Sequence, residues 1–164
     1  MAEFFDVLTP EGLPSGVRKS RAAVHRDGDL HGSVHIWVLR PGAVLLQKRR
    51  EDKDSFPGCF DVSSAGHVDA GEDFSAAALR ELGEELGLRP RPEQLHALFT
   101  QHIDVRAQYR GVPFHSRELN RVYLLDPACP LDRLHPQESE ISLVRWFSKA
   151  EIDAAIACQD KTFC

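Results

Sequence analysis

Residues 66–88, GHVDAGEDFSAAALRELGEELGL, decide the fold that we expect for this chain. The segment 73–86 is rich in helix-forming residues. Asp73 is available as an N-cap, and Gly87 is placed to end the helix in a left-handed turn. The stretch therefore predicts a loop followed by a helix. Gly83 lies inside that helix at a cost of about 1 kcal/mol relative to alanine, and close packing is the only explanation that the sequence suggests.

Three glutamates of the expected helix, Glu81, Glu84 and Glu85, form an acidic cluster. On a helical wheel of about 100° per residue they fall beside the apolar stripe, where we expect the rim of a cleft. Like charges at this spacing repel, and Arg80 can offset only one of them. Clustered carboxylates are typical ligands of a hard divalent cation, Mg²⁺ or Mn²⁺. The alternative on this local evidence is a charged surface helix.

From Gly66 onward, the sequence matches the pattern G-x5-E-x7-R-E-U-x-E-E-x-G-U, where U is aliphatic, at every specified position. If each of the seven fixed residues is about as common as glycine, roughly 7%, a chance match has a probability on the order of 10⁻⁸. The stretch resembles the Nudix box. This resemblance implies a single Nudix domain over residues 1–164, an α/β/α sandwich with a mixed β-sheet. It also implies an enzyme that hydrolyses a diphosphate linked to another moiety.

The resemblance assigns a role to each fixed position of the box. The metal ligands would be Glu81, Glu84, Glu85 and the carbonyl of Gly66. The framework of the box would consist of a salt bridge between Glu72 and Arg80, which holds the helix against the loop, and the closing turn at Gly87.

The general base is open, because in this superfamily it is either a box glutamate, here Glu81, or a carboxylate from a later loop. Candidates outside the box are Glu118, at the start of an expected strand, and Glu138 or Glu140, in the loop before residue 141. A general base must reach the attacking water directly or through one other water. The alternative for each later candidate is an ordinary surface acid.

The rest of the chain reads as strands with one further helix. Two short apolar runs at 4–8 and 17–24, separated by prolines and glycines, read as a hairpin-like entry. Residues 49–74 read as one long polar loop, and such loops are usually functional. The remaining expected strands are 33–39, 44–47, 95–105, 118–125 and 141–147, and the second helix is 149–158.

Basic side chains cluster where the strand at 44–47 ends. Lys48, Arg49 and Arg50, with Lys53 shortly after them, could contact the distal phosphate of a diphosphate substrate. The alternative is a solvated strand end.

A second likeness narrows the subfamily. Residues 31–67, the HRDGDLH segment and the ELNRVYLL strand resemble isopentenyl-diphosphate isomerases and their hydrolase relatives. In those isomerases the residue two before the loop histidine is a proton-transferring cysteine, but here it is Ala65. The likeness also implies that His25, His31 and His67 bind a separate metal, for which neutral imidazoles favour Mn²⁺ or Zn²⁺. The alternative is three polar loop residues.

The charge and composition of the chain argue against several other classes of protein. The 164 residues carry a formal net charge of -5, so a broad basic surface for nucleic acid is not expected. The N-terminus has acids where a signal peptide would be basic, and no apolar run approaches the length of a membrane helix. Four scattered cysteines, without a C-x-x-C pair, fit a reducing cytoplasm.

We therefore expect a cytoplasmic Nudix hydrolase that acts on a small-molecule diphosphate with Mg²⁺ or Mn²⁺, without a nucleic-acid or membrane partner. Whether it forms a homodimer is open. An isopentenyl-diphosphate isomerase-like enzyme and a non-catalytic Nudix-like ligand-binding module are the alternatives. The complete set of box glutamates favours hydrolysis, since binding modules typically lose some of them.

Overall fold

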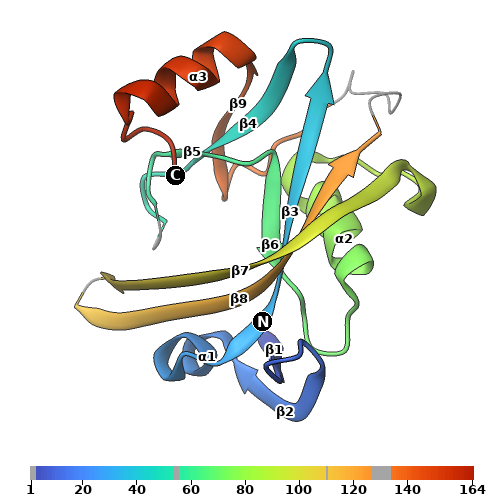
Figure 1. Cartoon of the computed structure of the whole chain (residues 1–164), viewed down its shortest axis with the longest axis vertical. Coiled ribbons are helices and arrows are strands. Elements are labelled where there is room, and N and C mark those ends of the chain that lie inside the picture. Colours follow the sequence, from blue (N-terminus) through green and yellow to red (C-terminus); the bar gives the residue numbers. More distant parts are fainter. Residues whose placement is uncertain (1–2, 54–55, 110, 127–133) are drawn as a thin grey trace.

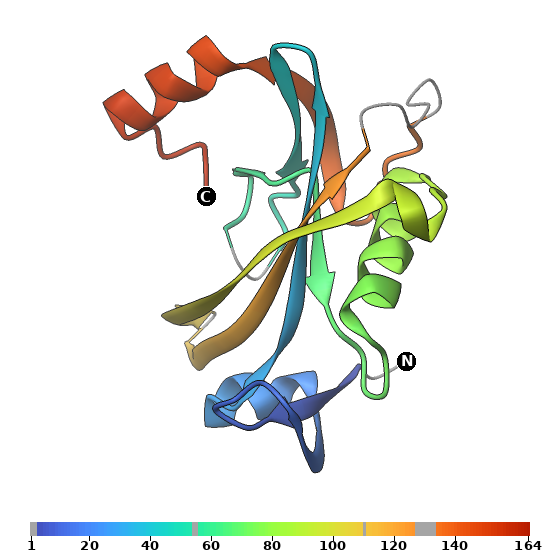
Figure 2. The same ribbon diagram turned by 45° about the vertical axis from the view of Figure 1, so that its right-hand side comes forward.

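The computed structural model describes residues 3–53, 56–109, 111–126 and 134–164. In chain order the elements are β1 (Phe4–Leu8), β2 (Pro14–Ser20), α1 (Arg21–Asp27), β3 (Leu30–Arg40), β4 (Ala43–Arg49), β5 (Phe60–Asp61), β6 (Ser64–His67), α2 (Phe74–Leu86), a 3-10 turn (Pro92–Gln94), β7 (Leu95–Tyr109), β8 (Val112–Leu125), β9 (Ile141–Ser148) and α3 (Lys149–Cys158). Helix α2 covers one face of the main sheet and α3 the other, while β1, β2 and α1 lie together at one end (Figure 1, Figure 2).

The main sheet is mixed, which confirms the α/β/α sandwich expected from the sequence. Its order is β5-β4-β3-β8-β7, with β6 also paired to β3 and β9 to β4. The central strand β3 runs antiparallel to β4 and β6 and parallel to β8. On one face of β3, Val34, Ile36 and Val38 are almost fully buried and join Leu82 and Leu86 of α2 in the hydrophobic core.

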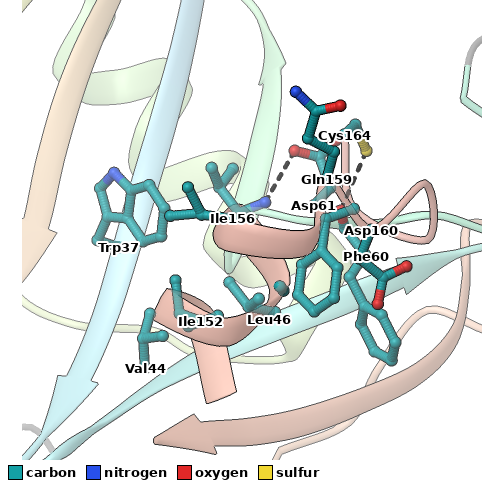
Figure 3. A pocket seen from close by; sticks show the side chains of 13 residues that line it. Trp37, Val44, Leu46, Phe60, Asp61, Ile152, Ile156, Gln159, Asp160 and Cys164 are labelled. Carbon is teal, nitrogen blue, oxygen red and sulfur yellow. Dashed lines mark hydrogen bonds between the residues drawn. The ribbon is translucent and has the colours of Figure 1, made fainter. Parts of the chain in front are cut away.

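Side chains alternate along a strand, so the other face of β3 carries a second set of residues. This face runs from polar to aromatic along the strand, through His31, Ser33, His35 and Trp37. Trp37 lies under α3, and both line one cavity (Figure 3). The face of β3 that points away from α2 therefore joins the N-terminal end of the molecule to α3.

The strand β3 has two successive partners along one edge, and the sheet forks between them. Residues Val38–Arg40 pair with β4, whereas Ser33–Ile36 pair with β6. Ser63 lies at the junction: its Oγ accepts a hydrogen bond from Val38 N at 2.8 Å and donates one to Leu45 O at 2.5 Å. The segment 60–67 thus crosses from β4 to β3, which brings its backbone to the middle of the sheet.

Two local expectations were wrong. The long loop at 49–74 contains the strands β5 and β6, because the edges of β4 and β3 offer backbone partners that a local reading of polar residues cannot reveal. The expected strand at 17–24 ends at Ser20, whose side chain accepts from Ala23 N at 3.4 Å and caps the additional helix α1.

Within the described residues, no helix is long and apolar enough to cross a membrane. Cys59, Cys158 and Cys164 are free thiols, and Cys129 lies outside the described residues.

Candidate active site

Helix α2 presents the acidic cluster at the fork of the sheet. Asp73 caps the helix by accepting from Ser75 N and Ala76 N, both at 2.9 Å, and Gly87 ends it with a φ of 71°. The three box glutamates differ in exposure. Glu85 is 8% exposed, whereas the side chains of Glu81 and Glu84 are 13% and 55% exposed. Two carboxylates therefore point inward and one toward solvent.

Arg80 ties the helix to the loop before it. Its guanidinium donates to both carboxylate oxygens of Glu72, at 3.1 and 2.9 Å, and to the carbonyl of His67 at 2.9 Å. It also donates to Glu81 at 2.7 Å and to Glu84 at 3.2 Å. The pair of Arg80 and Glu72 is thus formed. One guanidinium faces four carboxylates, since Asp69 also lies 4.0 Å away, so the cluster keeps a net negative charge.

One oxygen of the Glu85 carboxylate accepts three hydrogen bonds. Its Oε2 accepts from Ser64 Oγ at 2.7 Å, from Ala65 N at 3.0 Å and from Gln47 Nε2 at 3.3 Å. Among the described residues, Oε1 of Glu85 accepts no hydrogen bond. The carboxylate is therefore oriented by β4 and β6, with its second oxygen available to a ligand.

Burial changes the acidity of the two inward carboxylates. It raises the pKa of Glu85 to about 8 and that of Glu81 to about 7, with hydrogen bonds from Ser64 and Arg80 opposing the rise. Negative charge in this position favours an oxygen-liganded divalent cation. The donor set of Glu81, Glu84 and Glu85 fits Mg²⁺ or Mn²⁺.

Gly66 and Glu81 are in direct contact. A Cβ placed on Gly66 would lie 1.9 Å from Oε1 of Glu81 and 2.7 Å from its Cγ, so the glutamate fills the space that a side chain at position 66 would need. This contact puts the Glu81 carboxylate against the backbone of β6. The carbonyl of Gly66 belongs to the same short segment.

The three histidines form a second cluster. His25 of α1, His31 of β3 and His67 of β6 bring ligand atoms within 4.8 Å of one another. The Nε2 atoms of His25 and His31 are buried without a hydrogen-bond partner among the described residues. His31 Nδ1 lies 3.0 Å from the carbonyl of Asp29, which makes Nδ1 the donor and leaves Nε2 with a lone pair. Phe5 stacks on the rings of His31 and His67.

These imidazoles are neutral near pH 7. Burial lowers the pKa of His25 to about 4 and holds the pKa of His67 well below its ordinary value. Glu118 lies at the edge of the cluster, with Oε1 3.8 Å from His67 Nε2 and 2.6 Å from the donating Ser116 Oγ. Since His67 is neutral, its contact with Glu118 is polar rather than ionic.

The four basic side chains proposed as phosphate ligands differ in the partners that they contact. Arg49 lies 3.5 Å from Asp61, and Arg50 binds Asp52 and the carbonyl of Glu138. Lys53 forms an ion pair with Glu140, so a candidate phosphate ligand and a candidate general base contact each other. Among the described residues, the Lys48 ammonium has no ion-pair partner. The Glu138 side chain is exposed at the surface.

Two residues of the site were missed in the sequence. Gln47 is 2% exposed and Ser64 is fully buried, and both donate to Glu85. Gln47 could have been recognised in the sequence, because it is a polar residue that continues the apolar run of a strand. Ser64 gives no such signal, because its role depends on the pairing of β6 with β3.

The fold is an α/β/α sandwich, and its helix α2 carries buried carboxylates at the fork of a mixed sheet. The NUDIX domain family matches residues 29–163. The chain therefore belongs to the Nudix family.

Individual relatives agree with this assignment. Over 98% of its length the chain is 39% identical to Nudix hydrolase 3 of Arabidopsis thaliana, but it spans only 21% of that protein. It is 31% identical to an isopentenyl-diphosphate Delta-isomerase of Halorhodospira halophila, over 90% of this chain and 81% of the other. A crystal structure from Deinococcus radiodurans superimposes with a TM-score of 0.71 at 20% identity, covering 95% of this chain and 90% of that one, which shows the shared fold.

Proposed function

We propose that this chain is a divalent-metal-dependent hydrolase that cleaves the diphosphate linkage of a small molecule. The observation that carries the proposal is the pair of inward carboxylates, Glu81 and Glu85, held against the backbone of Gly66 and Ala65 within a complete Nudix box. Relatives named as Nudix hydrolases support the reaction class.

The metal site would consist of Glu81, Glu84, Glu85 and the carbonyl of Gly66, with Mg²⁺ or Mn²⁺ as the ion. When bound, such an ion neutralises the diphosphate, polarises phosphorus and lowers the pKa of water. The need for it follows from charge, because a protein with a formal net charge of -5 would otherwise repel a dense anion.

The chain's own residues orient the site. Arg80 braces α2 against the loop through Glu72 and His67, and Gln47 and Ser64 fix one oxygen of Glu85. Lys48 has no ion-pair partner among the described residues and is therefore our first candidate for the distal phosphate. Arg49 and Lys53 are weaker candidates, since each already lies beside an acid.

Two carboxylates compete for the role of general base. In the metal-free protein, burial raises the pKa of Glu81 to about 7, the range of a general base that acts near neutral pH. Glu118 lies on the histidine side of the site, 15% exposed, and has Ser116 as a hydrogen-bond donor. Glu140 is less suited, because its carboxylate is already engaged in an ion pair with Lys53, and Glu138 faces solvent. We therefore favour Glu81, with Glu118 as the alternative.

We also propose that His25, His31 and His67 bind a transition metal such as Mn²⁺ or Zn²⁺. The support is geometric: two buried Nε2 atoms, which have no hydrogen-bond partner in the described part of the chain, lie beside a third imidazole, with Glu118 close to His67. Buried polar atoms are normally satisfied, so an ion explains the arrangement better than a set of polar framework residues.

An isomerase is less well supported by the site. Ala65 faces His35 across the β3–β6 pair, and a methyl group cannot transfer a proton to carbon. The nearest cysteine in sequence, Cys59, instead lies 3.5 Å from the carbonyl of Lys161, beside the C-terminal segment.

A release assay tests the proposal. Nucleoside diphosphate derivatives, isoprenoid diphosphates and thiamine diphosphate are incubated with the chain and Mg²⁺ or Mn²⁺, and phosphate or monophosphate is measured. We expect metal-dependent turnover of at least one compound and loss of it with a chelator. Binding without turnover of any compound would instead support the ligand-binding module.

A further inference from the structure

The strand β1 contacts both the histidine cluster and the Nudix box. It pairs with β2 in a separate two-stranded sheet, and among the described strands it forms no ladder with the main sheet. Its contacts with the rest of the chain are therefore side-chain contacts and single hydrogen bonds. They include contacts with the histidine rings and with residues 68–73, the loop between β6 and α2 that we call the box loop (Figure 2).

One residue of β1, Phe5, packs against the histidine rings. Phe5 is 1% exposed, and its ring centroid lies 4.7 Å from that of His67 and 5.4 Å from that of His31. It also meets the ring of His25 edge-on at 6.3 Å. The three imidazoles belong to α1, β3 and β6, so an ion bound by all three would fix these elements relative to one another. The surface against which Phe5 packs would be fixed with them.

The residues on either side of Phe5 hold the box loop. The carbonyl of Phe4 accepts a hydrogen bond from Ala70 N at 2.8 Å. The Oδ2 atom of Asp6 accepts one from Gly71 N at 2.7 Å. Three consecutive residues of β1 thus connect the histidine rings with two consecutive amides of the box loop.

The box loop leads directly to the residues that support the acidic cluster. Gly71 is followed by Glu72, whose carboxylate accepts two hydrogen bonds from Arg80. Arg80 also donates to Glu81 and to the carbonyl of His67. His67 therefore belongs to the histidine cluster through its ring and to the support of the acidic cluster through its carbonyl.

The histidine cluster gives an ion a reason to hold the N-terminal end together. Buried polar atoms without a hydrogen-bond partner are costly, and the Nε2 atoms of His25 and His31 have none among the described residues. An ion removes this cost only while α1, β3 and β6 stay together. Helix α1 has seven residues and is too short to be stable on its own. Ion binding therefore favours the packed arrangement in which Phe5 contacts the rings.

We propose that β1 couples the two metal sites, so that a transition-metal ion at the histidine cluster strengthens Mg²⁺ binding at the acidic cluster. The ion fixes the rings around Phe5, and β1 then holds the box loop through Phe4 and Asp6. Asp6 is the positioning residue of this connection, because its carboxylate bonds directly to the loop. The inference rests on the proposed function, which assigns both metal sites. By reciprocity, Mg²⁺ at the acidic cluster must strengthen ion binding by the histidines to the same extent.

The test measures the affinity of the chain for Zn²⁺ by competition with a chromophoric zinc chelator, with and without saturating Mg²⁺. In the wild-type chain Mg²⁺ should tighten Zn²⁺ binding at least about fivefold, at the lower end of the usual coupling between sites. Asp6→Ala should lower this factor to about twofold or less, while the chain still binds one Zn²⁺. The double variant His25→Ala, His31→Ala should lose the Zn²⁺ site itself.

Glu3→Ala is the matched control for Asp6→Ala. Both residues are acids at the N-terminal end that pair with an arginine, Arg21 for Glu3 and Arg18 for Asp6. Among the described residues, the Glu3 side chain forms no hydrogen bond with the box loop. Its replacement should therefore leave the coupling factor within about twofold of the wild-type value.

A second measurement needs no variant of β1. Amide hydrogen exchange followed by NMR resolves Ala70 and Gly71, and Zn²⁺ alone should slow their exchange at least about fivefold in the wild-type chain. The same ion should not change their exchange in the double histidine variant. This measurement stays decisive even where Asp6→Ala fails to fold.

Three results would overturn the coupling: a wild-type chain that binds no Zn²⁺, an equal Zn²⁺ affinity with and without Mg²⁺, or Zn²⁺ binding that leaves exchange in the box loop unchanged. Both measurements report binding rather than turnover. A failure of the coupling is therefore distinguishable from a failure of hydrolysis, which the release assay detects.

Discussion

The Oε1 atom of Glu81 lies 1.9 Å from the point that a Cβ on Gly66 would occupy. Glycine at position 66 is therefore a requirement of the acidic cluster rather than of the backbone conformation. The contact links a strand residue that pairs with Val34 to a helix residue beside Arg80. Any side chain at this position must displace the carboxylate.

Gly66→Ala should accordingly reduce kcat/KM at least about 100-fold while changing the melting temperature by only a few degrees, since a flexible side chain moves more easily than the core. Steady-state kinetics with Mg²⁺ and thermal unfolding measure the two effects. Gly42→Ala is a control for the loss of a glycine, because Gly42 has a φ of 75° and a Cβ there meets nothing within 4 Å. That variant should cost stability and leave activity in place. Near wild-type activity of Gly66→Ala would refute the role of Glu81.

The stabilisation by Mg²⁺ should increase with pH. In the metal-free protein, burial raises the pKa of Glu81 to about 7 and of Glu85 to about 8, above the ordinary value of 4.5. The folded state then binds more protons than the unfolded state, so its stability falls as pH rises through 7 and 8. Mg²⁺ replaces these protons, and the melting temperature gained on adding it should grow by about 3 °C or more between pH 6.5 and 9. A gain that is independent of pH, or equally large in Glu85→Gln, would contradict the assignment.

Gly83→Ala should stabilise the protein by about 0.5 to 1 kcal/mol. The sequence suggested close packing as the reason for Gly83, but the structure does not support it. Among the described residues, a Cβ there would meet the carbonyl of Leu88 alone, at an ordinary 3.6 Å. Denaturant unfolding measures the change in free energy, with Gly32→Ala as the contrasting variant. A Cβ on Gly32 would lie 3.0 Å from Cβ and Cγ2 of Val68, so the same substitution there should destabilise. A destabilised Gly83→Ala would show that the helix needs glycine for another reason.

The histidine cluster should bind one transition-metal ion. Isothermal titration calorimetry with Mn²⁺ or Zn²⁺ should give one fewer ion per chain for the double variant His25→Ala, His31→Ala than for wild type. His115→Ala is a suitable control, because His115 pairs with Asp104 and is not one of the three clustered histidines. An unchanged stoichiometry, with clear binding by wild type, would reduce the three histidines to framework.

Local signals predicted the helix well and the fork poorly. The N-cap at Asp73 and the left-handed turn at Gly87 are short-range features, and the structure has both. The contacts of Glu85 with Gln47 and Ser64 connect residues 38 and 21 positions apart. They depend on how β4 and β6 share the edge of β3, which no local pattern encodes.

The same limit applies to the basic residues and the later acids. From the sequence, Lys53 and Glu140 were independent candidates for phosphate binding and proton transfer, but the fold joins them as an ion pair. The apolar cavity under α3 was not anticipated at all. Its walls come from β3, β4 and β5 and from the C-terminal helix, which is far from these strands in the chain.

The most direct test of the central claim is metal-dependent turnover by wild type, Glu84→Gln and Glu85→Gln on a compound hydrolysed in the release assay. Glutamine keeps the shape of each side chain and removes the charge of a metal ligand. We expect wild-type turnover only with Mg²⁺ or Mn²⁺, and at least a 100-fold lower kcat in each variant, with circular dichroism spectra that match the wild type. Near wild-type rates in the folded variants would contradict the account.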